Sequence, residues 1–128
     1  MCIRDSCVLI IMGMIDDDTA KALFDEAAAL GLDALIETHD GEELTRAVKL
    51  GGSLIGINNR DLRTFHTTLN TFTALAPKAP KGCTLIAESG IFTREDIIRL
   101  VEHGAQGYLI GESLMRQDDV EGAVGRLA

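Results

Sequence analysis

Four apolar segments of this chain each end on a polar side chain or a glycine, and this repeated ending constrains the fold more than any other feature. The segments are Ala34–Glu37, Leu54–Asn58, Thr84–Glu88 and Gly107–Ile110, and a continuous apolar run, Val8–Met12, precedes them. Such runs are typical of parallel strands buried on both faces. Because helix-like segments separate the runs, the sequence predicts a parallel sheet with right-handed crossovers.

The segments between the predicted strands have helical periodicity and recognisable ends. Asp40 with Glu43 resembles a capping box. Thr93 and Asp96 are residue types that can begin a helix. The sequence carries no linker, so residues 7–128 are predicted to be one α/β domain, part of a (β/α)8 barrel with its active site in the loops after the strands. Helices are predicted at Thr19–Leu30, Glu42–Leu50, Leu69–Ala76, Arg94–His103, Glu112–Met115 and Val120–Leu127.

Composition narrows the function classes. Of 128 residues, 46% are hydrophobic and the formal net charge is −8, which argues against nucleic acid and anionic membrane surfaces as partners. Neither the three cysteines nor the three histidines show a metal-ligand spacing, so we expect no disulfide framework and no metal. Val8–Met12 is too short to span a bilayer. The first residues do not show the apolar region followed by a small-residue cleavage site that is typical of a signal peptide. We expect a cytoplasmic protein.

Three polar side chains end neighbouring predicted strands and are the candidate catalytic groups. Glu37 and Glu88 each close an apolar strand, and Asn58 closes the strand between them. A carboxyl group at an apolar barrel mouth loses hydration, which raises its pKa and suits it to proton transfer. Either glutamate alone could instead be a solvated loop acid, but parallel strands would bring all three ends to one rim.

A candidate anion site follows the last two strands. Ser89 and Gly90 precede one helix, and Gly111 and Glu112 precede a short helical turn. Glycine permits close backbone approach, and free N–H groups can hold a phosphate. Glu112 would serve through its backbone N–H with its carboxylate turned away. The alternative is a pair of plain turn glycines.

Two further side chains near this rim have weaker claims. Arg60 could clamp a carboxylate, or it could form a surface salt bridge to Asp61 or Asp40. His39 lies close to Glu37 in the sequence, and we assign it a catalytic role only as a minor alternative.

Four runs of residues, taken together, resemble the indole-3-glycerol phosphate synthase family. The runs are Leu35–Asp40, Ile55–Leu62, Ala87–Ile91 and Leu109–Arg116, and the Asn58–Arg60 stretch is the most specific. The resemblance implies ring closure and decarboxylation of 1-(2-carboxyphenylamino)-1-deoxyribulose 5-phosphate, a carboxy-lyase step in tryptophan biosynthesis. It implies no cofactor, because the substrate itself supplies the electron sink. Its implied roles are acid/base chemistry for Glu37, electrostatic support for Glu88, and substrate orientation for Asn58 and Arg60, with a phosphate cradle at Ser89, Gly90, Gly111 and Glu112.

The resemblance begins near Cys7 and implies that the first three barrel strands, with their lysines, are missing. We therefore expect residues 1–6 to be a non-native stub and the chain to be an inactive fragment that self-associates through exposed strand edges. Two alternatives remain. One is a non-catalytic phosphate-binding half-barrel that needs a partner, and the other is a different phosphate-binding barrel enzyme such as phosphoribosylanthranilate isomerase.

Overall fold

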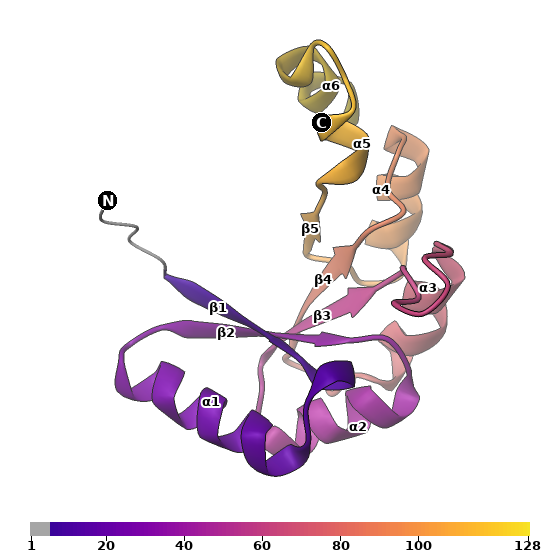
Figure 1. Ribbon diagram of the computed structural model, residues 1–128. Helices are drawn as coiled ribbons and strands as arrows, with labels where there is room; N and C mark the ends of the chain where they lie inside the picture. The colour runs from indigo at the N-terminus through magenta and orange to yellow at the C-terminus, as the bar shows by residue number, and fades with distance from the viewer. Residues whose placement is uncertain (1–5) are drawn as a thin grey trace.

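The computed structural model describes residues 6–128 and contains one parallel sheet (Figure 1). Five strands are hydrogen-bonded in the order in which they occur in the sequence, and every neighbouring pair is parallel. This order is the one a barrel requires, because each crossover advances by one strand in the same direction. The strands are β1 (Cys7–Ile11), β2 (Asp33–Thr38), β3 (Leu54–Asn58), β4 (Thr84–Glu88) and β5 (Gly107–Leu109).

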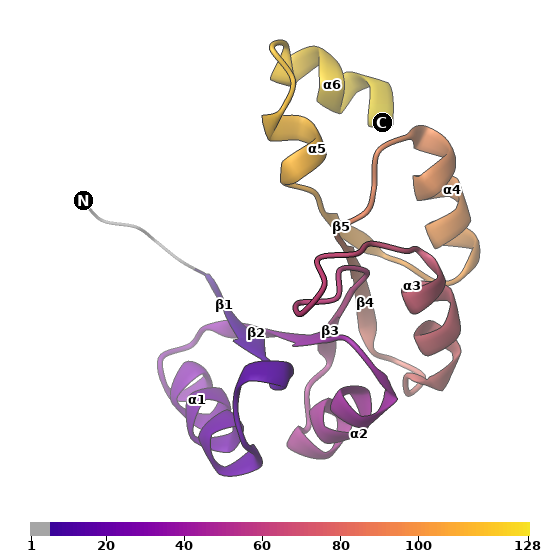
Figure 2. The same cartoon turned by 45° about the vertical axis from the view of Figure 1, so that its right-hand side comes forward.

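Helices follow the strands and lie along the outer side of the curved sheet, as Figure 2 shows for α1 to α4. The helices are α1 (Asp17–Ala29), α2 (Gly41–Leu50), α3 (Asn70–Leu75), α4 (Arg94–Glu102), α5 (Glu112–Met115) and α6 (Val120–Leu127), with 3-10 turns η1 (Met12–Met14) and η2 (Ala76–Lys78). The predicted partial barrel is therefore confirmed, with an open sheet in place of a closed one.

Most element boundaries agree with the sequence-based prediction to within two residues. Two short turns were not foreseen, η1 after β1 and η2, which follows the end of α3 and contains Pro77. Of the six residues predicted to be a stub, Met1–Asp5 lie outside the described residues. Ser6 extends the sheet, since its carbonyl accepts a hydrogen bond from the Asp33 N–H at 2.9 Å.

The core lies between the sheet and the helices. Ile36, Ile55 and Ile57 point outward from the strands and are fully buried, as are Phe72 of α3 and Leu100 of α4. The inner face of the sheet is different, because side chains there have no second layer over them. Leu9 of β1 is 47% exposed and Leu109 of β5 is 51% exposed.

Strand register brings the carboxyl ends of β2, β3 and β4 to one edge of the sheet. Glu37 pairs with Gly56, and Asn58 pairs with Glu88. Gly56 and Asn58 are two residues apart on one strand, so they face the same side of the sheet. The inner face at this edge is therefore where the polar strand ends can meet.

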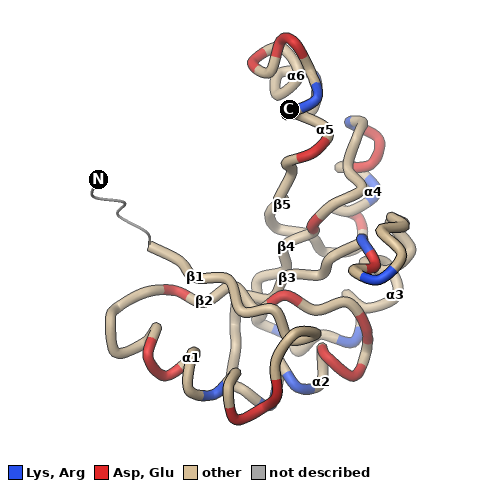
Figure 3. The backbone as a smooth tube through the Cα atoms, viewed as in Figure 1, with Lys and Arg blue, Asp and Glu red and all other residues tan. Residues whose placement is uncertain are grey.

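Charged positions do not form a basic face. Figure 3 shows Lys and Arg scattered singly among more numerous Asp and Glu positions along the described chain. Across residues 6–128, none of the helices combines the length and the apolar character that a membrane crossing would need.

Candidate active site

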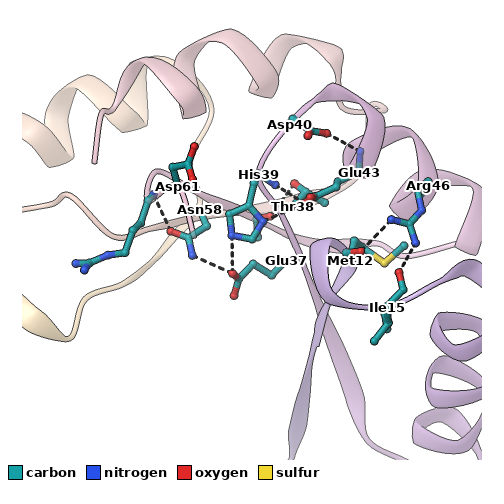
Figure 4. Close-up of polar contacts among 12 residues, drawn as sticks. Met12, Ile15, Glu37, Thr38, His39, Asp40, Glu43, Arg46, Asn58 and Asp61 are labelled. Atoms are coloured by element: carbon teal, nitrogen blue, oxygen red, sulfur yellow. Dashed lines mark hydrogen bonds and ion pairs between the residues drawn. The ribbon is translucent and has the colours of Figure 1, made fainter. Parts of the chain in front are cut away.

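Glu37, Asn58 and Glu88 come together at the carboxyl edge of the sheet. The Asn58 Nδ2 group donates a hydrogen bond of 2.9 Å to Glu37 Oε1 (Figure 4). All three side chains are buried, with Glu88 only 2% exposed. The Asn58 oxygen accepts from the Arg60 N–H at 2.9 Å, which fixes the orientation of the amide group. The three side chains therefore form one polar cluster on an otherwise apolar face.

His39 completes this cluster from the loop after β2. Its Nε2 lies 3.0 Å from Glu37 Oε1, and its Nδ1 lies 2.9 Å from Glu43 Oε2. The same Glu43 oxygen accepts from the His39 backbone N–H at 2.8 Å. The close contact with Glu37, together with the hydrogen bond to Glu43, raises the pKa of His39 to about 9 against the opposing effect of burial. His39 is therefore a cation at neutral pH, held between two carboxylates.

The position of Glu43 corrects part of the predicted cap of α2. Asp40 is the N-cap, and its side chain accepts from the Glu43 N–H at 2.9 Å. The Glu43 carboxylate does not return to the Asp40 N–H, as a capping box would require. It turns to His39, so this first-turn acid is a member of the site.

The ionisation of Glu37 is opposite to the sequence-based expectation. Burial acts to raise the pKa of Glu37, but its contacts with His39, Asn58 and Glu88 outweigh it and lower the pKa below its usual value. The prediction that an apolar barrel mouth would raise the pKa of Glu37 was wrong. Sequence reasoning had no means of placing the His39 imidazole against this carboxylate.

Glu88 is the glutamate that holds a proton at neutral pH. Burial, followed by the negative charge of Glu37, raises the pKa of Glu88 to about 8. Its Oε1 atom is buried without a hydrogen-bond partner. The carboxyl group lies over Gly56, where an added Cβ would come within 1.9 Å of Oε1. The absence of a side chain at Gly56 therefore makes room for the protonated glutamate.

Asn59 ties the site to the segment that follows β3, and sequence reasoning gave it no separate role. Its oxygen accepts from the Phe72 N–H at 3.0 Å, and its Nδ2 donates to the Ser89 carbonyl at 3.2 Å. Its backbone N–H donates to the Glu88 carbonyl at 2.8 Å. One buried amide thus connects the ends of β3 and β4 to the first turn of α3.

The Ser89 and Gly90 backbones adopt left-handed conformations directly after β4. Their φ values are 61° and 71°. This region is uncommon for a serine, and such strain clusters at functional sites. At Gly90, any added Cβ would also contact Thr67 at 3.4 Å. These residues line a hollow of about 520 Å³ together with Gly111 and Ser113.

Arg60 and Glu112 also line this hollow, and they form an ion pair with each other. Arg116 contacts the other Glu112 oxygen at 2.7 Å. The hydrogen bond from Arg60, followed by the charge of Arg116, lowers the pKa of Glu112. The alternative of a salt bridge from Arg60 to Asp61 or Asp40 is not what the structure has, because Arg60 pairs with Glu112. The prediction that the Glu112 carboxylate would turn away from the hollow was wrong, because it faces Arg60.

A second hollow, of about 510 Å³, lies beside the cluster and is polar. His39, Asn58 and Arg60 line it together with the loop after β3. Within residues 6–128, no group of three or more His, Cys, Asp and Glu side chains is arranged to hold a metal ion. What the cluster can do is move a proton, since an ionised and a protonated carboxyl group lie together.

The fold and the site together define a class of protein. Parallel strands in sequence order, each followed by a helix, and polar groups at the carboxyl ends of the strands are features of (β/α)-barrel enzymes. The solved structure of thiamine phosphate pyrophosphorylase from Pyrococcus furiosus has a similar fold, with a TM-score of 0.71 and 18% identity, covering 95% of this chain and 57% of that one.

Comparison with known sequences identifies the family. The sequence model of indole-3-glycerol phosphate synthase matches residues 2–127, and the chain belongs to this family. The indole-3-glycerol phosphate synthase of a Nocardioides species is 48% identical over 120 residues, which is 94% of this chain and 46% of that protein. The enzyme of Hyphomonas neptunium is 52% identical over 111 residues, covering 87% of this chain and 42% of that protein. The chain thus spans about half the length of these curated relatives.

Proposed function

We propose that this chain carries the carboxyl-terminal part of an indole-3-glycerol phosphate synthase active site. The full site would close and decarboxylate 1-(2-carboxyphenylamino)-1-deoxyribulose 5-phosphate in tryptophan biosynthesis, in the cytoplasm and without a cofactor. The observation that carries the proposal is the convergence of Glu37, Asn58 and Glu88 beside the hollow at Ser89 and Gly90. The reaction is inferred from membership of the family, and the cluster contains side chains suited to its proton transfers.

The two glutamates would divide the proton transfers of this reaction. Ring closure needs an acid that protonates the substrate ketone, and loss of CO₂ then restores the aromatic ring. Loss of water follows, and it needs an acid for the departing hydroxyl and a base for the proton on the adjacent carbon of the new ring. Glu88, with its pKa raised to about 8, has a proton to give at neutral pH, whereas Glu37 is ionised and can accept one. Asn58 would hold Glu37 in place and orient the substrate.

The hollow beside the cluster would hold the substrate phosphate. Ser89, Gly90 and Gly111 line it, and Arg60 adds a positively charged residue to the lining. Glu112 forms an ion pair with Arg60 in the free chain, so an incoming anion would take the place of a carboxylate. Arg60 could then pair with the substrate carboxylate or phosphate at little extra cost in desolvation.

The isolated chain would have little or no activity. Among the described residues, the cluster contains carboxyl groups, one imidazole and one amide, with no lysine. The resemblance implies lysines elsewhere in the full site, and each positioned proton-transfer group that is absent typically costs about 10² to 10⁴ in rate. A turnover assay with the substrate, read by indole product formation, tests this. We expect no product above the uncatalysed background, and turnover at the rate of a full-length relative would contradict the proposal.

Binding tests the site independently of turnover. The amide spectrum of the ¹⁵N-labelled chain can be followed while the same substrate is added. We expect shifts at Ser89, Gly90 and Gly111, because these residues line the hollow. Gly51, Gly82 and Gly104 lie in turns before β3, β4 and β5, at the opposite edge of the sheet, and serve as internal controls. Shifts at the control glycines alone, or none at all, would contradict the site.

A further inference from the structure

The cluster contains an arrangement that neither the proposed proton transfers nor the phosphate site uses. His39 lies between two carboxylates from different elements, Glu37 of β2 and Glu43 of α2. We propose that His39 is a positioning residue that keeps Glu37 ionised, so that the proton shared by the rim resides on Glu88. We call this distribution of charge, with Glu37 ionised and Glu88 protonated, the ionisation order. Its consequence for catalysis rests on the proposed function, but the ionisation order itself does not.

The geometry fixes which ring nitrogen meets which carboxylate. Nδ1 is 2.9 Å from Glu43 Oε2, and Nε2 is 3.0 Å from Glu37 Oε1. The Glu43 oxygen also accepts from the His39 N–H at 2.8 Å, which fixes ring and backbone together. Nδ1 is hydrogen-bonded to Glu43, whereas Nε2 lies near Glu37 Oε1 without hydrogen-bond alignment, so this second contact is an ion pair. Two carboxylates this close to one imidazole favour its charged form. The imidazolium form is therefore the one this site is built for.

The placement of Glu43 is itself fixed by its neighbours. Its N–H is capped by Asp40 at 2.9 Å, which sets the first turn of α2. On the other side lies Gly13 of η1, where an added Cβ would come within 2.7 Å of Glu43 Oε1. The carboxylate therefore has room only because residue 13 is glycine, and its side chain is directed to His39.

The other charged groups around His39 support the same order. Asp61, from the loop after β3, has its pKa lowered first by backbone hydrogen bonds from Arg63 and Thr64 and only weakly by the charge of His39. Glu88, from β4, has its pKa lowered slightly by His39, but burial and Glu37 dominate and raise it. The strong partners of His39 are thus Glu37 and Glu43 alone.

A functional consequence follows from the shared proton. Two carboxyl groups that lie together cannot both ionise easily, and either could hold the proton. A fixed cation beside one of them removes this ambiguity. With His39 in place, Glu37 is the acceptor and Glu88 the donor, and a neutral residue at position 39 would let the proton distribute between them.

The test is an NMR titration of the chain without substrate. The ring ¹⁵N shifts of His39 should show both nitrogens protonated at pH 7, and a neutral ring at that pH would overturn the inference. In His39→Gln, the carboxyl ¹³C midpoint of Glu37 should rise by about 1 to 3 pH units, the usual effect of removing an adjacent opposite charge. An unchanged midpoint would also overturn it.

Two variants guard against loss of folding and against general effects. Glu43→Gln keeps His39 and an acceptor for its ring but removes one negative charge. The titration midpoint of His39 should therefore fall, while Glu37 stays ionised at pH 7. An unchanged His39 midpoint would contradict the inference. His66→Gln removes an exposed histidine that contacts neither glutamate, and it should leave both carboxyl midpoints unchanged. This titration uses no substrate, so a negative result would not contradict the proposed function. A negative result in the substrate-binding test would in turn not contradict the ionisation order.

Discussion

At the scale of single residues, the site depends on where each ionisable group finds its partner. Glu37 and Glu88 both end apolar strands, and the sequence alone treats them as equivalent. The structure separates them, because Glu37 contacts His39 and Asn58 whereas Glu88 is buried over Gly56. The consequence is a pair of carboxyl groups with opposite pKa shifts.

The opposite shifts predict how stability depends on pH. The pKa values of Glu88, raised to about 8, and His39, raised to about 9, mean that the native state binds protons more tightly than the unfolded chain. Stability from these groups is present at low pH and is lost as pH rises through pH 8 and 9. Glu37, with its lowered pKa, acts oppositely and loses its contribution only as pH falls below its usual range.

We therefore expect the free energy of unfolding to be larger at pH 6 than at pH 9, as measured by urea denaturation. Glu88→Gln should make the decline between these pH values shallower, because one of the two titrating groups is removed. A stability that rises from pH 6 to pH 9 would contradict the assignment of protons at this rim.

The space over Gly56 gives a second prediction at this scale. Gly56→Ala places a methyl group within 1.9 Å of Glu88 Oε1, so the carboxyl group must leave its buried position. We expect the fold to persist and the titration near pH 8 to move toward the usual glutamate range. Gly125→Ala, in α6 with no neighbour within 4 Å, is the matched control and should leave that titration unchanged. An unshifted Glu88 in Gly56→Ala would contradict the close contact.

At the scale of elements, N-terminal caps determine where each helix begins. They thereby determine where the loops at the carboxyl edge of the sheet end. Thr93 and Asp96 form a reciprocal capping box at the start of α4, where the sequence predicted a helix start. Thr93→Ala should cost about 1 kcal/mol in the free energy of unfolding, a typical value for loss of an N-cap. Thr19→Ala, in the first turn of α1, is the control. Its backbone N–H donates to Asp16 Oδ1 at 2.8 Å, and the substitution keeps this bond, so we expect a change within about 0.5 kcal/mol. Equal losses in the two variants would contradict the role of the cap.

Much of the element order could be predicted from the sequence, and particular contacts could not. The strands β3 and β4 match their predicted bounds, because apolar runs with glycine and polar ends are strong signals. The pairing of Arg60 with Glu112 was missed because it joins residues far apart in the sequence, from the ends of β3 and β5. The left-handed Ser89 was missed for another reason, since no residue type there announces a positive φ.

At the scale of the whole molecule, the inner face of the sheet is uncovered. Leu9 and Leu109, on the two edge strands, are each about half exposed on a face that a closed barrel would bury. Open strand edges and apolar faces favour association. We expect dimers or larger species by size-exclusion chromatography with light scattering at micromolar concentrations.

The uncovered face can be tested with paired leucine variants. Leu9→Gln with Leu109→Gln should shift the chain toward monomer, because it makes the inner face polar. Leu30→Gln is the control, since Leu30 is exposed at the C-terminal end of α1, on the outer side of the sheet. A wild-type chain that is monomeric at every concentration, or an equal effect of Leu30→Gln, would contradict this expectation.

The most direct test of the polar cluster as a whole is to measure the pH at which the Glu88 carboxyl group loses its proton. Carboxyl ¹³C spectra of glutamate-labelled chain, recorded from pH 4 to pH 10, should contain one carboxyl group that titrates near pH 8, and its signal should be absent in Glu88→Gln. That result would place a proton-bearing carboxyl group at the end of β4 beside an ionised one. If every glutamate titrated in the ordinary acidic range, the convergence of buried polar strand ends would be contradicted.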